Sequence, residues 1–173
     1  MNQPQVIIGL SNPKSPTNVG AVMRAAGCYG ATEVRYSGER YDRAVKFHTD
    51  TKKASSHIPL RPSDDLLCGV DTPLSVVCIE LVEGATPLPE FEHPEHAIYL
   101  FGPEDGSLDK HLVERAEHVV YVPTKGCMNL AATVNVLLYD RMAKSDYARG
   151  DELIRRSRDT RNRLKLEPVS DPA

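Results

Sequence analysis

One stretch of the sequence, residues 129–138 (NLAATVNVLL), does most to limit the folds open to this chain. The side chains of residues 130–139 are apolar nearly all round the helix that they would form, and Asn129 is a residue type that commonly caps a helix N-terminus. A helix with so much apolar surface must be buried on most sides, in a core or against a second subunit. It follows a strand-like run at 119–123 and a polar loop at 123–126 whose backbone is free to bind a ligand. The sequence therefore predicts a buried helix whose entrance forms part of a binding site.

Strand-like and helix-like runs alternate along the rest of the chain. The apolar runs predict strands at 5–10, 33–36, 74–81, 97–101 and 118–122. The helical patterns predict helices at 18–29 (closed by Gly30), at 63–68 (closed by Gly69), near 109–115 and from 129 onward. Residues 38–62 are mostly polar and predict a long loop, and Pro87, Pro89 and Pro94 mark an extended connection. This order indicates a Rossmann-like α/β fold, with a mostly parallel sheet and helices on both of its faces.

Composition limits where such a chain is found. No apolar run approaches the ~18–20 residues that cross a bilayer, and the polar N-terminus does not have the pattern of a signal peptide. The four cysteines form no C-x-x-C pair, which is typical of reduced thiols; they are Cys28, Cys68, Cys78 and Cys127. No His, Cys and Asp cluster has the spacing of metal ligands. We therefore expect a cytoplasmic protein with neither a membrane anchor nor a metal.

Charge is distributed unevenly along the chain. The net charge is −3, yet residues 144–165 hold eight Lys and Arg against four Asp and Glu, whereas residues 1–143 hold 13 against 18. A basic segment beside an acidic core favours contact with phosphates, although a solvated helix end would have the same composition. We expect one α/β domain over residues 1–150, followed after Gly150 by a basic C-terminal arm over residues 151–173.

Three segments at the ends of predicted strands carry related motifs. They are NVGAVMR at 18–24, FGPE at 101–104, and VP at 122–123 followed by MNL at 128–130. In their order and spacing they resemble the motifs of the TrmH-like (SpoU) branch of the SPOUT superfamily, and the resemblance covers most of residues 5–143. A lone Gly-Pro-Glu would be a weak signal, but three motifs in the same order are a strong one.

The resemblance implies both a fold and an activity. Members of this branch are S-adenosylmethionine-dependent RNA 2′-O-ribose methyltransferases, so residues 1–150 are expected to form a SPOUT domain with a C-terminal trefoil knot. The family also implies a homodimer with the cofactor bound beside the subunit interface. Because the chain resembles the core-only members, several of which act on tRNA, tRNA is the first expected substrate and rRNA the second.

Specific residues receive roles from the same resemblance. Arg24 matches the catalytic arginine of the family, and because a guanidinium stays protonated we expect it to hold a phosphate and stabilise the developing alkoxide. Asn18 and Asn129 are expected beside the substrate, and each is also suited to cap its own helix. The cofactor would be held by three loops, at Glu80, Leu81, Gly102, Glu104, Val122, Cys127 and Met128. From the residues alone, a tight turn after a strand is the better interpretation of either loop taken singly, and a lone exposed arginine such as Arg24 is usually a solvated side chain.

Two departures from the family pattern favour an alternative. Cys127 stands where the family commonly has serine, and Ser107 stands at the last glycine position of the second motif. A thiol is a poorer hydrogen-bond partner than a hydroxyl, so a non-catalytic RNA-binding relative of the same fold is the second hypothesis. A nucleotide-binding dehydrogenase is excluded, because no Gly-x-Gly-x-x-Gly follows the first predicted strand. His57 and Lys53 lie in the predicted loop and are not assigned a catalytic role.

Overall fold

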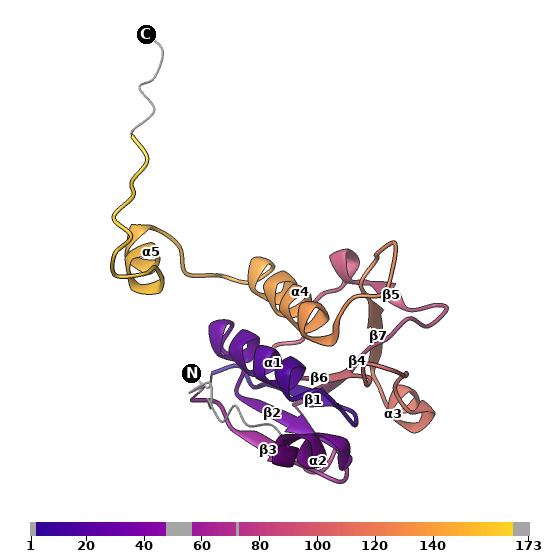
Figure 1. The fold of residues 1–173 in the computed structure, drawn as a ribbon. Coiled ribbons are helices and arrows are strands. Elements are labelled where there is room, and N and C mark those ends of the chain that lie inside the picture. The colour runs from indigo at the N-terminus through magenta and orange to yellow at the C-terminus, as the bar shows by residue number, and fades with distance from the viewer. Residues whose placement is uncertain (1–2, 48–56, 72, 168–173) are drawn as a thin grey trace.

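A parallel β-sheet is the centre of the molecule (Figure 1). The computed structural model describes residues 3–47, 57–71 and 73–167, and within these the sheet has seven strands in the order β3-β2-β1-β6-β4-β7-β5, each pair parallel. The strands are β1 Val6–Leu10, β2 Glu33–Tyr36, β3 Leu60–Pro62, β4 Ser75–Ile79, β5 Thr86–Pro87, β6 Ala97–Phe101 and β7 His118–Tyr121. The predicted α/β fold is confirmed, and the sheet is entirely parallel in the described part of the chain.

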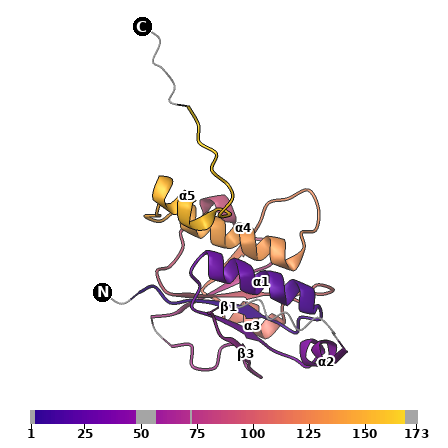
Figure 2. The same cartoon turned by 60° about the vertical axis from the view of Figure 1, so that its left-hand side comes forward.

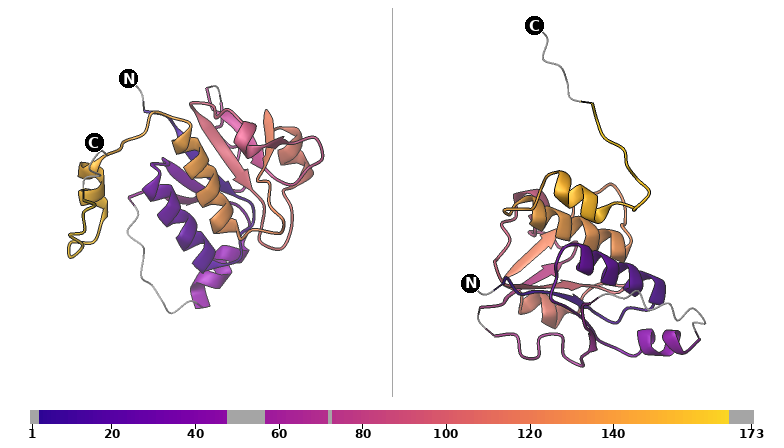
Figure 3. Two further views of the ribbon diagram at one scale, coloured as in Figure 1. Left: turned by 90° about the horizontal axis from the view of Figure 1, so that it is seen from above. Right: turned by 90° about the vertical axis from the view of Figure 1, so that its left-hand side faces the viewer.

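Helices cover both faces of this sheet. They are α1 Pro16–Cys28, α2 Arg40–Phe47, α3 Lys110–Glu114, α4 Leu130–Ala143 and α5 Asp151–Ser157, with a 3₁₀ turn at Leu88–Glu90. Helices α1 and α4 lie side by side on one face, whereas α3 lies on the other (Figures 2 and 3). No helix within the described ranges is long and apolar enough to cross a membrane.

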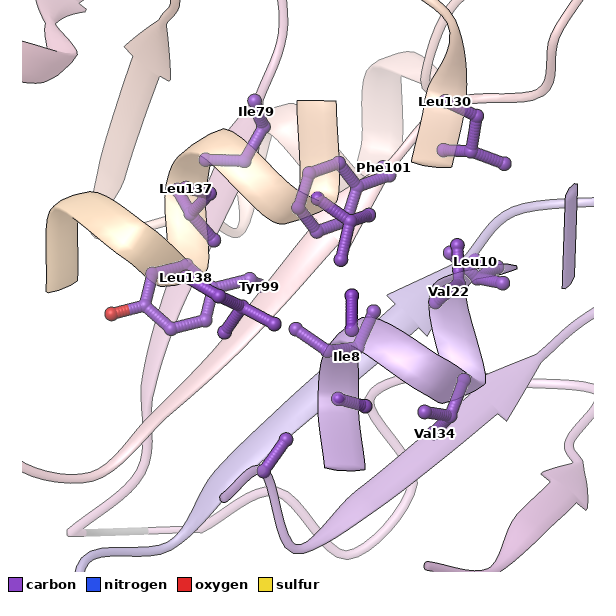
Figure 4. Close-up of a cluster of buried hydrophobic side chains, with 14 of the residues drawn as sticks. Ile8, Leu10, Val22, Val34, Ile79, Tyr99, Phe101, Leu130, Leu137 and Leu138 are labelled. Carbon is purple, nitrogen blue, oxygen red and sulfur yellow. The ribbon is translucent and has the colours of Figure 1, made fainter. Parts of the chain in front are cut away.

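The two faces of the sheet carry separate apolar cores. Strands β1 and β6 are buried at every residue, as expected for central strands of a parallel sheet. Tyr99 and Phe101 of β6 and Ile8 of β1 point toward α1 and α4, where they meet Leu137 of α4 (Figure 4). Ile98 and Leu100 of β6 join the smaller core under α3. Because side chains of β6 alternate between the two cores, the sheet lies between these cores and contributes residues to both.

Helix α4 is the apolar helix that the sequence predicts. Asn129 caps it, and its side-chain oxygen accepts hydrogen bonds from the N–H groups of Ala131 at 2.8 Å and Ala132 at 3.4 Å, which confirms the predicted cap. The expected burial on most sides is not reached within one subunit, and burial of the remaining surface against a second subunit stays a prediction. Only the stripe Leu130, Ala131, Val134, Leu137 and Leu138 is buried. Val136 and Tyr139 on the remaining surface are 37% and 57% exposed.

The segment from residue 38 to residue 68 departs from the sequence prediction. Instead of one long loop it contains α2 and β3; residues 48–56, with Lys53, lie outside the described residues. The predicted helix at 63–68 is wrong, because these residues form a turn that ends at Gly69 with φ +67°. The turn buries the adjacent Leu66 and Leu67 against the second core, and Arg35 donates hydrogen bonds to the carbonyl oxygens of residues 66 and 68.

The C-terminal half has an unusual connection. Strand β7 lies between β4 and β5, so the segment 80–85, which joins those two strands, crosses over the end of β7. The trefoil knot that the resemblance implies stays a prediction. Beyond α4 the chain leaves the sheet, and no residue of α5 is buried (Figure 1).

Candidate active site

A cavity of about 330 Å³ opens at the carboxyl ends of β4, β6 and β7. Ligands of α/β sheets bind at this end of the strands, because there the loops converge and their backbone groups face outward. Nine of the ten residues that the sequence assigns to the site line this cavity: Asn18, Glu80, Leu81, Gly102, Glu104, Val122, Cys127, Met128 and Asn129. Residues of all three predicted motifs therefore meet at one place.

Glu104 ties the second motif to the first. Its carboxylate accepts hydrogen bonds from the backbone N–H groups of Lys14 at 3.0 Å and Ser15 at 3.2 Å, and from the side-chain amide of Asn18 at 3.2 Å. Burial alone would raise the pKa of Glu104, but these hydrogen bonds, with one from its own backbone N–H, lower it below the ordinary value. Glu104 is therefore held as a carboxylate that fixes the loop after β1.

Asn18 links the first motif to the third, but it does not cap its helix. Ser15 is the N-cap of α1, and its hydroxyl accepts a hydrogen bond from the Asn18 N–H at 3.2 Å. Pro16 is well suited to the first helical position, so the helix begins two residues earlier than the sequence predicts. The Asn18 side chain is then free to accept a hydrogen bond from the Asn129 amide at 3.1 Å while it donates to Glu104.

Glu80 closes the second motif loop onto the end of β4. Its two carboxylate oxygens accept hydrogen bonds from the N–H groups of Leu108 and Leu81, both at 2.9 Å. Gly102 is explained by the same loop, because a Cβ there would lie 3.0 Å from the Leu108 nitrogen and 3.1 Å from the Ser107 carbonyl carbon. The absence of a side chain at Gly102 is thus required by its own loop, and a cofactor contact at this residue stays a prediction.

The third motif loop is held less tightly. The Thr124 hydroxyl donates a hydrogen bond to the Gly126 carbonyl at 2.6 Å, and a Cβ at Gly126 would contact nothing within 4 Å. Cys127 is exposed and Met128 is half-buried at the cavity wall. This wall therefore offers a thiol, a thioether and open backbone.

Comparison with known proteins identifies the family. A model of the SpoU rRNA Methylase family matches residues 5–139. The chain belongs to this family. No curated protein matches the sequence.

Solved structures share the SpoU fold. The SpoU methyltransferase AviRb from Streptomyces viridochromogenes, in complex with the cofactor AdoMet, is 18% identical with a TM-score of 0.65, over 82% of this chain and 58% of that chain. A structure concerned with the 2-OH methylation of C/U34 on tRNA is 23% identical with a TM-score of 0.68, over 83% of this chain and 92% of that chain. The TrmH/SpoU tRNA modifying enzyme of A. aeolicus is 20% identical with a TM-score of 0.64, over 83% of this chain and 76% of that chain. The chain thus spans less than two thirds of AviRb.

Arg24 is the one predicted site residue that does not line the cavity in this SpoU family member. It lies on the exposed side of α1, six residues beyond Asn18, which corresponds to about 9 Å along a helix axis. Within the described residues it has no salt-bridge partner. Its catalytic role stays a prediction.

An ion pair at the rim was not predicted from the sequence. Arg40, at the start of α2, lies 2.9 Å and 3.0 Å from the two carboxylate oxygens of Asp105, the residue after Glu104. The Arg40 guanidinium holds the pKa of Asp105 at about 2, below its ordinary value. No signal in the sequence joins these residues, because 65 positions separate them. The described residues contain no group of three or more side chains that could hold a metal ion.

Proposed function

We propose that this chain transfers a methyl group from S-adenosylmethionine to a ribose 2′-hydroxyl of RNA. The observation that carries the proposal is the network Glu104–Asn18–Asn129, which binds the three family motifs into one cavity wall. Membership of the SpoU rRNA Methylase family supports the same reaction.

The residues of the cavity are compatible with S-adenosylmethionine. Apolar side chains of Leu81, Val122 and Leu130 can contact an adenine, while the open backbone of the third loop offers hydrogen bonds. When bound, the cofactor supplies an electrophilic methyl group on a sulfonium. Asn18 and Asn129 hold their amides at the cavity and would orient the ribose.

For the class of RNA that is methylated, we propose tRNA. The structure concerned with the 2-OH methylation of C/U34 on tRNA aligns with this chain over 92% of its own length, and this similarity supports tRNA as the substrate. rRNA is the second candidate, because the family is described as rRNA methylases.

The test is methylation of RNA by the purified protein with methyl-labelled S-adenosylmethionine. Unfractionated tRNA and rRNA are incubated separately, digested to nucleosides and analysed by mass spectrometry. The expected product is a 2′-O-methylated nucleoside from tRNA, in the same yield with and without a chelator, because we expect no metal at this site. Binding of RNA with no cofactor binding and no product would instead support the non-catalytic relative that Cys127 and Ser107 favour.

We further propose a homodimer formed through the exposed sides of α1 and α4. Val136 and Tyr139 on α4 are exposed, and α1 beside it presents the small residues Gly20 and Ala21. Small side chains allow two helices to approach closely, and an apolar surface of this kind is stabilised by burial.

Val136→Asp should therefore dissociate the dimer, because a carboxylate in an apolar interface is left without a partner. Sedimentation equilibrium is expected to give twice 19.1 kDa for the wild type and 19.1 kDa for the variant at micromolar concentration. Val45→Asp on α2 is the matched control, since Val45 is 42% exposed against 37% for Val136. A monomeric wild type, or dissociation by both variants, would contradict this interface.

The C-terminal arm, residues 151–173, is proposed to contact RNA phosphates. Within α5, Arg155 and Arg156 lie near Asp151 and Glu152. Among residues 151–167, which the structure describes, the cations without a salt-bridge partner follow the helix. They are Arg158, Arg161, Arg163 and Lys165. Each phosphate contact contributes a slope of about 0.7–0.9 in log affinity against log salt.

Deletion of residues 151–173 should weaken tRNA binding and reduce this slope by roughly 2–3, with cofactor affinity unchanged. Fluorescence anisotropy between about 50 and 200 mM salt measures the slope, and replacement of the four cations by alanine in the full chain is the control. An unchanged slope with a lower dimer mass would show that the arm packs on the partner subunit.

A further inference from the structure

Helix α2 is fastened to the loops that form the candidate site. The Arg40 guanidinium donates to both carboxylate oxygens of Asp105 and, at 2.6 Å, to the carbonyl oxygen of Asn12. Asp105 follows Glu104 in the second motif loop, and Asn12 lies in the loop after β1. A bidentate pair between charged groups fixes direction as well as distance. The start of α2 is therefore bound to Asp105, the residue that follows the cavity-lining Glu104 in the sequence.

A second contact fixes how α2 is turned. The Tyr36 hydroxyl donates a hydrogen bond to Asp42 at 2.7 Å, and the rings of Tyr36 and Tyr41 meet edge to face with centroids 4.8 Å apart. Tyr36 belongs to β2 and is buried in the larger core. The inner side of α2 is thus anchored to the sheet, and its other side is directed to solvent.

The outer side of α2 carries two cations and an aromatic ring. Arg43, Lys46 and Phe47 stand at positions i, i+3 and i+4, which share one face of a helix. Phe47 is 87% exposed, more than any other Phe or Tyr among the residues whose positions are described, so it contributes nothing to a core. Arg43 pairs with Glu39, whereas Lys46 has no ion-pair partner within those residues. Exposed aromatic rings beside cations are typical of surfaces that stack bases and neutralise phosphates.

The site itself lacks the positive charge that an RNA substrate requires. The residues that line the cavity include no Lys or Arg, and two of them, Glu80 and Glu104, are carboxylates. Residues 1–143 together carry five more acidic than basic side chains. A phosphodiester next to the target ribose must therefore find its cations at the rim. Helix α2 is a rim element with three cations against one acid.

From this placement we propose that α2 is an RNA-docking helix, in which Phe47 stacks on a base close to the target nucleotide while Lys46 and Arg43 contact the flanking phosphates. Arg40 acts as a positioning residue, because its pair with Asp105 holds this surface at a fixed distance from the cavity. The proposal deepens the proposed function and rests on it for the nature of the substrate.

Fluorescence anisotropy with labelled unfractionated tRNA tests the surface. Phe47→Ala should weaken binding on the order of 10-fold without changing the salt slope, because stacking involves no counterion release. Phe47→Trp should restore the affinity. Lys46→Ala should instead reduce the slope by about 0.7–0.9, as expected for one lost phosphate contact.

Two matched variants separate docking from general effects. Val45 is 42% exposed on the same helix but points away from Phe47, so Val45→Ala should leave tRNA affinity unchanged. Lys110 on α3, with a side chain 88% exposed, lies on the other face of the sheet, so Lys110→Ala should keep the wild-type slope. Equal losses in the Phe47 and Val45 variants would mean that α2 is merely destabilised, and would overturn the proposal.

Calorimetry with S-adenosylmethionine separates this inference from the proposed function. The wild type and the α2 variants are expected to bind the cofactor equally. Cofactor binding and methylation by the wild type, with normal tRNA affinity and slope in the Phe47 and Lys46 variants, would refute docking by α2 and leave the proposed function intact. A wild type that binds tRNA through Phe47 but no cofactor would refute the proposed function alone, and one that binds neither tRNA nor rRNA would refute both.

Discussion

Arg24→Ala is expected to lower the rate of RNA methylation by about 10²–10³-fold while the affinity for S-adenosylmethionine stays near that of the wild type. The reason is that the cavity has no cation of its own, so a charge developing on the ribose oxygen depends on a guanidinium brought from outside its lining. Arg24 is exposed on α1 and has no salt-bridge partner in the described residues that would hold it elsewhere. Single-turnover kinetics together with calorimetry measure the two quantities separately.

Conservative replacement sharpens the test of Arg24. Arg24→Lys should recover little activity, because an ammonium cannot reproduce the bidentate hydrogen bonds of a guanidinium on a phosphate. Arg115→Ala is the control, since Arg115 is an exposed arginine after α3, on the other face of the sheet. Near-normal turnover of Arg24→Ala would refute the assignment and direct the search to His57, which is exposed, or to Lys53.

The strands of this fold could be predicted because the buried strands of a parallel sheet consist of short runs of apolar residues. Residues 97–101 form β6 over the predicted range, and 33–36 form β2. Helix α2 was not predicted, since its sequence RYDRAVKF is mostly polar, has no buried residue and offers only the short apolar stripe Tyr41, Ala44 and Val45. It is held by Asp42 and Arg40 through bonds to Tyr36 and Asp105, and a local pattern contains no information on such contacts.

The site was predictable as a set of residues but not as a network. The ends of parallel strands meet at one edge, so three motifs that follow strands were bound to lie close together. The hydrogen bonds that join them connect Asn18 to Glu104 and to Asn129, across 86 and 111 positions, and no spacing rule gives their geometry. Asn18 illustrates the limit, because it is predicted to cap α1, whereas Ser15 performs that role.

Glu104→Gln is expected to loosen the site and destabilise the fold. The Glu104 carboxylate accepts hydrogen bonds from the N–H groups of Lys14 and Ser15 and from the Asn18 amide. The glutamine amide has only one oxygen acceptor, and its NH₂ group would face some of these N–H donors instead of accepting from them. We expect a loss of about 1–3 kcal/mol in the free energy of unfolding at pH 7. Methylation should fall on the order of 10²-fold, as displacement of positioning groups by an ångström does elsewhere. Urea unfolding and the methylation assay measure the two effects.

The pH dependence of the same variant gives the decisive comparison. The pKa of Glu104 is lower in the folded than in the unfolded chain, so its stabilisation is complete above the unfolded pKa and is lost as the pH falls through the folded value. The free energies of unfolding of the wild type and of Glu104→Gln should therefore differ at pH 7 and approach each other toward pH 3. Glu114→Gln, at a 62% exposed side chain on α3, should match the wild type at pH 7. A difference between the wild type and Glu104→Gln that persists unchanged at acid pH would mean that the shape of the side chain, and not its charge, holds the motif loops together.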